Sequence, residues 1–348
     1  MRLLIGQHDL ADAARHILPV LDRSDPARQA VTLDGGETIT LTGTGPGGYS
    51  QVTLGGDVLE QGRATVNGLW LAAVAGALPD GEITVREDGE RLRLDEEGAK
   101  ATMAVMNGVG PVTLPDLPAT VDLGGTLEPL ARATVHAASP DPNRPVMTGV
   151  HIVGDGTRVT ACATDRYRMG MWAGDLPLDG EAIIPAPWLT RVKTMTRLGF
   201  DDHWVVASDG TATDATVVIA GEFPDMDRII PDKTNVEATV RFDRAALTDA
   251  IRGLKSLDFT GGVTGILFRR DDTGVTAMLT GADLDGDRHI DANCDGDGDE
   301  LRLNAQYLLD ALSALDGDEA VFYLPAGRKP ILIEGSGPVR QVVSRMML

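Results

Sequence analysis

The chain repeats itself three times over 348 residues, and this repeat restricts its possible folds more than any other feature. Three stretches of helical periodicity each carry an aromatic residue at the same place and end at a leucine before a turn. The stretches are 66–78, 185–198 and 304–315, with Trp70, Trp188 and Tyr307 at equivalent positions. An alternating, strand-like segment follows each turn. A fold with one undivided core is therefore excluded.

A second helical segment recurs on the same period. Each copy begins at a leucine and carries an arginine five residues later, on a different face from the apolar stripe. The pairs are Leu10 and Arg15, Leu127 and Arg132, and Leu247 and Arg252. Glycine- and aspartate-rich turns separate the short strands between the helices. We predict an α+β fold of three pseudo-repeated domains, 1–118, 119–233 and 234–348, each with two helices packed on antiparallel sheets.

The distribution of charge bears on the kind of partner. The formal net charge is -21, from 31 Lys+Arg and 52 Asp+Glu, so the chain as a whole repels nucleic acid. Two of the repeated helices are nevertheless basic. The first, 186–198, carries Arg191, Lys193 and Arg197, and the second, 244–255, carries Arg244, Arg252 and Lys255 against Asp249. Solvated helix faces would explain any one of these helices. Their recurrence across the repeats favours a surface that binds a polyanion.

Motifs of catalysis and cofactor binding are not supported. The G-x-G-x-x-G match at 43–48 precedes an alternating segment rather than a helix, so we predict a hairpin. The acidic run 283–300 lacks the glycine and the glutamate of a calcium loop, because Arg288 and Cys294 stand in their places. We expect no catalytic residue, no metal and no cofactor, and we interpret the chain as a non-enzymatic protein.

Cysteine content and hydropathy indicate the compartment. Cys162 and Cys294 are the only two cysteines, which is typical of a reducing environment rather than a disulfide framework. The longest uncharged run, 66–78, is shorter than the ~20 apolar residues of a membrane span. Charged residues near the N-terminus interrupt any signal-peptide core. We therefore expect a cytoplasmic protein.

Several segments resemble the bacterial DNA polymerase III beta subunit family, the beta sliding clamps. Residues 163–169 (ATDRYRM) are similar to the family's A-T-D-x-H-R-L, and 221–231 (GEFPDMDRIIP) to its F-P-D-Y-R-R-V-I-P. Residues 304–310, 329–333 and 342–348 resemble its third domain. The resemblance covers the whole chain, most weakly in the first domain.

The resemblance implies a DNA clamp fold in which each chain forms half of a ring. Two chains would join head to tail as a homodimer around duplex DNA, with helices lining the hole and strands forming the outer wall. It also implies a processivity factor for DNA polymerase that works with a clamp loader and binds DNA without sequence preference. A clamp-fold scaffold for protein interactions without DNA sliding is the alternative, which the net charge of -21 keeps open.

The resemblance further implies two sets of site residues. The cations we assign to DNA are Arg15, Arg23, Arg132, Arg191, Lys193, Arg197, Arg252 and Lys255. A peptide-binding groove between the second and third domains would tether the polymerase. Carried over by position, its lining is Met147, Thr164, Arg166, Tyr167, Arg168, Met169, Pro224, Arg228, Ile229, Asn304, Tyr307, Pro330, Val342, Ser344 and Met346. From the residues alone, this set would be an ordinary interface core between domains.

The chain departs from the family pattern inside this groove. Tyr167 replaces the usual histidine, and Met226-Asp227 replaces tyrosine-arginine. The ending Ser344-Arg345-Met346-Met347-Leu348 replaces M-P-M-R-L, which makes the groove more polar. We expect a peptide preference different from the usual glutamine-leucine-acidic-leucine-phenylalanine type.

Overall fold

The computed structural model describes residues 1–226, 228–270, 273–280, 284–296 and 300–347. By its internal contacts the chain forms two compact units, 1–125 with 194–218 and 126–193 with 219–348. Asp227, three aspartates of the acidic run and Leu348 lie outside the described residues. The three-domain boundaries read from the sequence stay a prediction.

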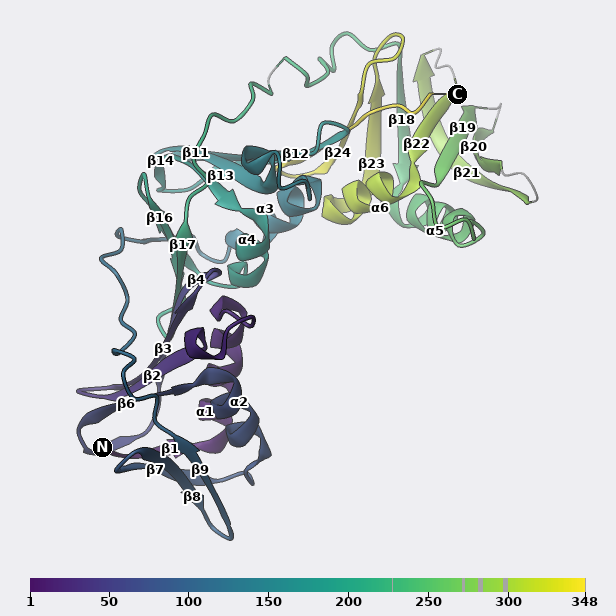
Figure 1. Cartoon of the computed structure of the whole chain (residues 1–348). Helices are drawn as coiled ribbons and strands as arrows, with labels where there is room; N and C mark the ends of the chain where they lie inside the picture. Colours follow the sequence, from purple (N-terminus) through teal and green to yellow (C-terminus); the bar gives the residue numbers. More distant parts are fainter. Residues whose placement is uncertain (227, 271–272, 281–283, 297–299, 348) are drawn as a thin grey trace. The chain divides into compact units, whose positions relative to one another are not determined.

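Within the described residues the α-helices form three pairs, one for each sequence repeat (Figure 1). The pairs are α1 (Gln7–Ile17) with α2 (Gly68–Ala77), α3 (Leu127–Thr134) with α4 (Ala186–Val192), and α5 (Arg244–Lys255) with α6 (Ala305–Ala314). Short polar side chains fix several starts. The Asn67, Asp243 and Asn304 side chains accept hydrogen bonds from free backbone N–H groups of α2, α5 and α6.

The first unit contains two antiparallel sheets. One has the order β5-β1-β7-β8-β9 and the other β10-β15-β16-β17-β4-β3-β2-β6. Fully buried Leu3, Leu10, Leu33 and Leu71 lie in the core around α1 and α2. The strands are β1 (Arg2–Gly6), β2 (Ala30–Gly35), β3 (Ile39–Gly45), β4 (Gly48–Leu54), β5 (Asp57–Glu60), β6 (Gly62–Asn67), β7 (Glu82–Asp88), β8 (Arg91–Glu96), β9 (Ala99–Ala104), β10 (Val121–Asp122), β15 (Arg197–Phe200), β16 (Trp204–Ser208) and β17 (Ala212–Val217).

The second unit is built on one sheet with the order β14-β11-β12-β13-β25-β24-β23-β18-β21-β20-β19-β22. Figure 1 shows α5 and α6 beside the strands of its C-terminal half. The strands are β11 (Gly149–Asp155), β12 (Arg158–Thr164), β13 (Arg168–Asp175), β14 (Asp179–Pro185), β18 (Ala238–Asp243), β19 (Gly265–Arg270), β20 (Gly274–Thr280), β21 (Asp285–Gly296), β22 (Leu301–Asn304), β23 (Asp316–Leu324), β24 (Ile331–Ser336) and β25 (Val339–Val343).

One helix is shorter than its repeat predicts. The sequence pattern continues to Leu198, but α4 ends at Val192 and β15 begins at Arg197. Leu198 pairs with β10 and β16 and is fully buried. Strand pairing therefore prevails over helical periodicity here. The helix predicted over 185–198 was wrong in its second half.

The sequence repeats are joined edge to edge by two strand pairings, which we call the junctions. In the first unit β4 pairs with β17, and Ser50 lies opposite Asp214. In the second unit β13 pairs with β25, and Gly170 lies opposite Gln341. Each junction thus joins the fourth strand of one repeat to the last strand of the next.

A buried polar side chain ties each junction to a helix. Asp214 is fully buried, and its Oδ2 lies 2.6 Å from Nε2 of His16 on α1. Gln341 is 1% exposed and donates to the Ala133 carbonyl oxygen on α3 at 2.9 Å, while His136 Nε2 lies 3.0 Å from its Oε1. Buried polar groups need such partners. The two junctions therefore share a design although their residues differ.

The glycine-rich segment 43–48 is the hairpin that the sequence predicts, because Gly45 and Gly48 pair at the ends of β3 and β4. Gly48 has a φ of 106°, and a Cβ there would overlap the Ala215 carbonyl of the first junction. Glycine is needed at this position for close approach of two backbones. The motif serves sheet joining rather than a nucleotide.

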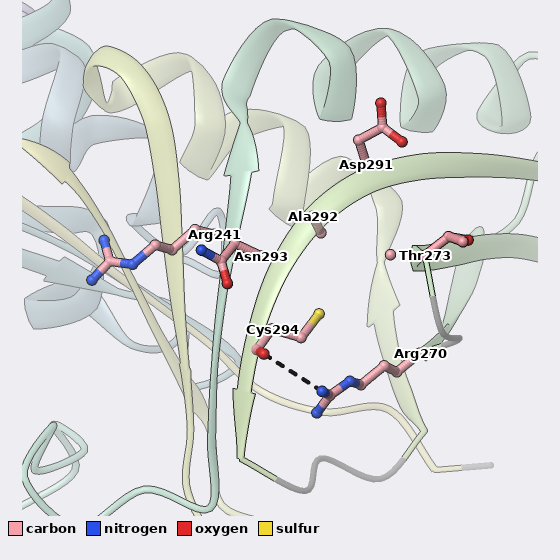
Figure 2. A pocket seen from close by; sticks show the side chains of 8 residues that line it. Arg241, Arg270, Thr273, Asp291, Ala292, Asn293 and Cys294 are labelled. Carbon is pink, nitrogen blue, oxygen red and sulfur yellow. Dashed lines mark hydrogen bonds between the residues drawn. The ribbon is translucent and has the colours of Figure 1, made fainter.

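A polar cavity of about 570 Å³ opens where β21 changes partners (Figure 2). The first half of β21 pairs with β20 as far as Asp291, and its second half pairs with β18 from Ala292. Arg270 donates to the Cys294 and Gly296 carbonyls across the fork. The guanidinium thereby satisfies backbone acceptors that the departing strand leaves open.

Candidate functional site

The arginine at the repeated helix position is exposed in all three repeats. The side chains of Arg15, Arg132 and Arg252 are 56%, 43% and 69% exposed on α1, α3 and α5. Each is paired with a carboxylate. The partners are Asp12, Asp316 at 2.5 Å and Asp249 at 3.3 Å, respectively. The sequence correctly placed these arginines off the apolar stripe, but it did not show their acidic partners.

The other predicted DNA contacts lie in more varied places. Arg191 is half-buried on α4, and Lys193 follows that helix and pairs with Glu128 at 3.4 Å. Lys255 ends α5 and donates to Gln306 Oε1 at 2.8 Å. Arg23 is exposed in a turn rather than on a helix.

Arg197 does not lie on a helix, which corrects the sequence analysis. It begins β15, and its guanidinium donates to Thr120 Oγ1 at 3.0 Å and to the Thr120 carbonyl oxygen at 2.7 Å. Two of the positive charges counted for the helix, those of Lys193 and Arg197, therefore lie outside α4. The helices are less basic than the sequence suggested.

Exposed ion pairs of this kind are weak. A solvent-exposed pair contributes about 0–1 kcal/mol, so a phosphate oxygen can replace the aspartate at little cost. The arginines at the repeated position offer charge to a backbone but no set of groups that reads bases. Such a surface suits sequence-independent binding that weakens with salt.

The predicted groove is a cavity of about 330 Å³ in the second unit. It is formed by the end of β12, the start of β13, the segment around Pro224 and the strand β25. Eleven of the predicted residues line it, namely Met147, Thr164, Arg166, Tyr167, Arg168, Met169, Pro224, Ile229, Pro330, Val342 and Ser344. Its wall is largely apolar with a few polar groups, as expected for a cavity that takes apolar side chains.

Arg168 holds one side of this cavity in place. Its side chain is 15% exposed, and it donates to Asp165 Oδ2 at 3.0 Å and to Asp310 Oδ2 at 2.5 Å. Its guanidinium also lies 4.3 Å from the centre of the Tyr307 ring. Burial, with a smaller effect of Asp165, raises the pKa of Tyr307, so the phenol stays protonated. Arg168 therefore links β13 to α6.

A tight turn precedes Arg168. Arg166 has a φ of 82°, a left-handed conformation that is uncommon for a residue other than glycine. Thr164 Oγ1 accepts from the Arg166 N–H at 3.0 Å and donates to the Arg168 carbonyl at 2.7 Å. Asp165 accepts from the Tyr167 N–H at 2.9 Å. The turn presents Tyr167, 59% exposed, at the cavity.

Four predicted groove residues do not line the cavity. Arg228 is exposed and pairs with Asp225 at 3.1 Å, and Asn304 caps α6. Tyr307 contacts Arg168, while the Met346 N–H donates to the Arg302 carbonyl at 2.8 Å.

Met226 lines the cavity and was not predicted. It packs against a buried cluster that includes Met169, Leu332 and Val342. The only signal in the sequence was its replacement of the family's tyrosine in the FPD segment, which indicated a departure rather than a contact.

No helix in the described part of the chain is long and apolar enough to cross a membrane. Among the same residues, no group of three or more His, Cys, Asp and Glu side chains could hold a metal ion.

Comparison with solved structures defines the class of fold. The DNA polymerase sliding clamp of Bacillus subtilis superposes with a TM-score of 0.92 at 16% identity, covering 100% of this chain and 99% of the other. The paired helices and joined sheets described above thus form the DNA clamp fold.

Sequence comparison then identifies the family, although no family model matches the chain. The beta sliding clamp of Micrococcus luteus is 32% identical over 213 residues, which cover 56% of this chain and 67% of that protein. The beta sliding clamp of Streptomyces coelicolor is 25% identical over 307 residues, 82% of this chain and 80% of that protein. This chain belongs to the beta sliding clamp family.

Proposed function

We propose that this chain is the processivity clamp of a replicative DNA polymerase. Two copies would close a ring around duplex DNA, and partners would bind through the groove in the second unit. The observation that carries this proposal is the pair of equivalent junctions, which join the three repeats by one rule and leave, among the described strands, one edge of each kind without a partner. This role requires that the protein encircle DNA and bind partners, and it requires no catalytic group.

We propose that the repeats 1–118, 119–233 and 234–348 are the domains of this clamp. The two units of the structure cut across these boundaries because strands of neighbouring repeats form continuous sheets. In the first unit, for example, β17 of the second repeat extends the sheet of β4.

The junctions also supply a rule for joining two copies. β4 and β13 each have an edge covered by the last strand of the next repeat. Their counterpart in the third repeat is the first half of β21, and the remaining last strand is β9. Among the described strands, β20 is the only partner of β21 over 285–291, and β8 is the only partner of β9. We infer that β21 of one copy pairs with β9 of the other, head to tail.

The register follows from the same equivalence. Gly286 corresponds to Ser50 and Gly170, and Ala101 corresponds to Asp214 and Gln341. Placing Gly286 opposite Ala101 of the second copy sets Asp287 opposite its Lys100. Opposite charges facing each other across strands stabilise such a pair. The two strand edges of the inferred interface are therefore complementary in charge as well as free to pair.

Apolar side chains flank the uncovered edge of β21. The Leu257 side chain lies over Gly286, where a Cβ would approach its Cδ1 to 2.8 Å. Leu284, directly before β21, is 43% exposed. Large exposed apolar side chains beside a bare strand edge are typical of a protein interface. A second copy would cover them.

Retention on circular DNA tests the proposal. We expect the protein, placed on a nicked circle by a clamp loader, to stay on the circle through gel filtration and to be lost when the circle is cut to a linear form. A ring held by topology gives this result, whereas a protein held by contacts stays on both forms. Equal retention on the two forms, or none on either, would contradict the proposal.

A clamp-fold scaffold that binds proteins but not DNA is the second candidate. The acidic partners of the arginines at the repeated position and the net charge of -21 favour it. This candidate predicts peptide binding in the groove together with no retention on the nicked circle. The same experiment therefore decides between the two.

A further inference from the structure

A second cavity of about 370 Å³ adjoins the groove. Both cavities are lined by Pro224 and Met226, so these two residues form a shared wall. The second cavity lies over β11, β12 and β13 on the other side of this wall. None of the residues assigned to the groove from the sequence, apart from Pro224, lines it.

The interior of the second cavity is suited to an apolar side chain. Phe223 stacks on the His151 ring with the ring centres 4.8 Å apart, and Met171 and Trp172 contribute from β13. Val153 on β11 is 36% exposed within this lining. Methionine and aromatic surfaces of this kind adapt to aliphatic partners.

Among the described charged groups at the second cavity, one arginine has no partner. Asp225 pairs with Arg228, and His151 lies 2.8 Å from Glu181 Oε1. Arg340 on β25 also lines the cavity, and its guanidinium has no hydrogen-bond or ion-pair partner within the described residues.

Arg340 is not neutralised by its neighbour across the strands. That neighbour is Glu334, whose carboxylate is bound by Lys233 at 2.9 Å. Arg340 is exposed, so its charge is accessible at the second cavity. It is suited to a carboxylate supplied by a ligand.

We propose that the second cavity binds the continuation of a partner peptide past the shared wall of Pro224 and Met226. The continuation would place an aliphatic side chain against Phe223 and Met171 and a carboxylate on Arg340. This inference rests on the proposed function, because the groove must first anchor the peptide. It extends the recognised segment from one cavity to two and adds an acidic residue to it.

Binding of synthetic peptides by fluorescence anisotropy tests the inference on the full chain. The short probe is Gln-Leu-Asp-Leu-Phe, the family's usual type, which we expect the groove of this chain to bind, although less tightly than its own preferred peptide. Two long probes add Leu-Glu through one glycine at either the N- or the C-terminus. Matched long probes end in Ser-Gln in place of Leu-Glu. We expect one long probe, and not its Ser-Gln counterpart, to bind about tenfold more tightly than the short probe, which corresponds to ~1.4 kcal/mol.

Two exposed substitutions locate the gain. Arg340→Gln removes the charge, and Thr160→Trp fills the cavity from β12, where Thr160 is exposed. Both should abolish the tenfold gain and leave binding of the short probe unchanged. Arg158→Gln, on the same strand but outside the cavity, should keep the gain and serves as the control.

The outcomes separate this inference from the proposed function. If the short probe binds and neither long probe gains, or if the gain survives both substitutions, the second cavity is not a binding site. If neither short nor long probes bind, the groove itself fails as the anchor and the inference fails with it.

Discussion

Removing the three arginines at the repeated position should make DNA binding much less sensitive to salt. In the change Arg15→Gln, Arg132→Gln and Arg252→Gln, each substitution removes one cation that we assign to a phosphate. One phosphate contact contributes ~0.9 to the slope of log K against log salt, so three contacts amount to about 2.7 for one chain and about 5 for a ring of two. The assay is anisotropy of a labelled duplex between about 50 and 200 mM salt.

A matched triple of strand arginines provides the control. Arg63, Arg86 and Arg241 are 58%, 45% and 47% exposed and also pair with acids, so their replacement by glutamine changes net charge and exposure equally. Both triples should fold, because exposed substitutions usually alter stability by less than ~0.5 kcal/mol. Equal salt slopes for the two triples would refute the assignment of the helices to DNA.

Three further outcomes are expected. Burial lowers the pKa of His136 below its ordinary value of 6.5, so the unfolded chain takes up this proton at a higher pH than the folded chain. Thermal stability should therefore fall as the pH drops below 6.5, and it should fall less steeply in His136→Gln. Arg168→Ala should reduce the free energy of unfolding in urea by about 3 kcal/mol, because Asp165 and Asp310 lose their shared cation, and a loss below ~1 kcal/mol would contradict that role. Lys100→Asp should shift the mass by light scattering towards one chain at low concentration, and adding Asp287→Lys should restore the dimer if the register is right.

Much of the fold could be predicted because short-range sequence patterns recur in each of the three repeats. Helix caps at Asn67 and Asn304 and the apolar stripes of α1, α3 and α5 are properties of neighbouring residues. The end of α4 could not be predicted, because Leu198 pairs with β10, a strand that is distant in the sequence. The hydrophobic periodicity of a segment does not show whether a distant strand pairs with it.

The groove residues were predicted largely from the resemblance to the family. That prediction is least informative where this chain departs from the family pattern. Thr164 and Val342, assigned to the groove from sequence position, both line the cavity, because they lie on strands of fixed register. Met226 was missed because it lies in an irregular segment, where only packing shows which way a side chain contributes. The acidic partner Asp316 of Arg132 is 184 residues away in sequence and no local pattern could reveal it.

The buried ties at the junctions have a consequence for how the proposed ring would come apart. Parting β4 from β17 would break the bond between His16 and Asp214. Parting β13 from β25 would break the bond from Gln341 to the Ala133 carbonyl on α3. At the positions of the inferred seam that correspond to Asp214 and Gln341 of the junctions and to the residues opposite them, the residues are only Ala101 and Gly286. Opening the seam there would break no side-chain hydrogen bond. In the proposed ring, the seam between copies would therefore be the weakest of the three joints, and the ring would open where one chain meets the other.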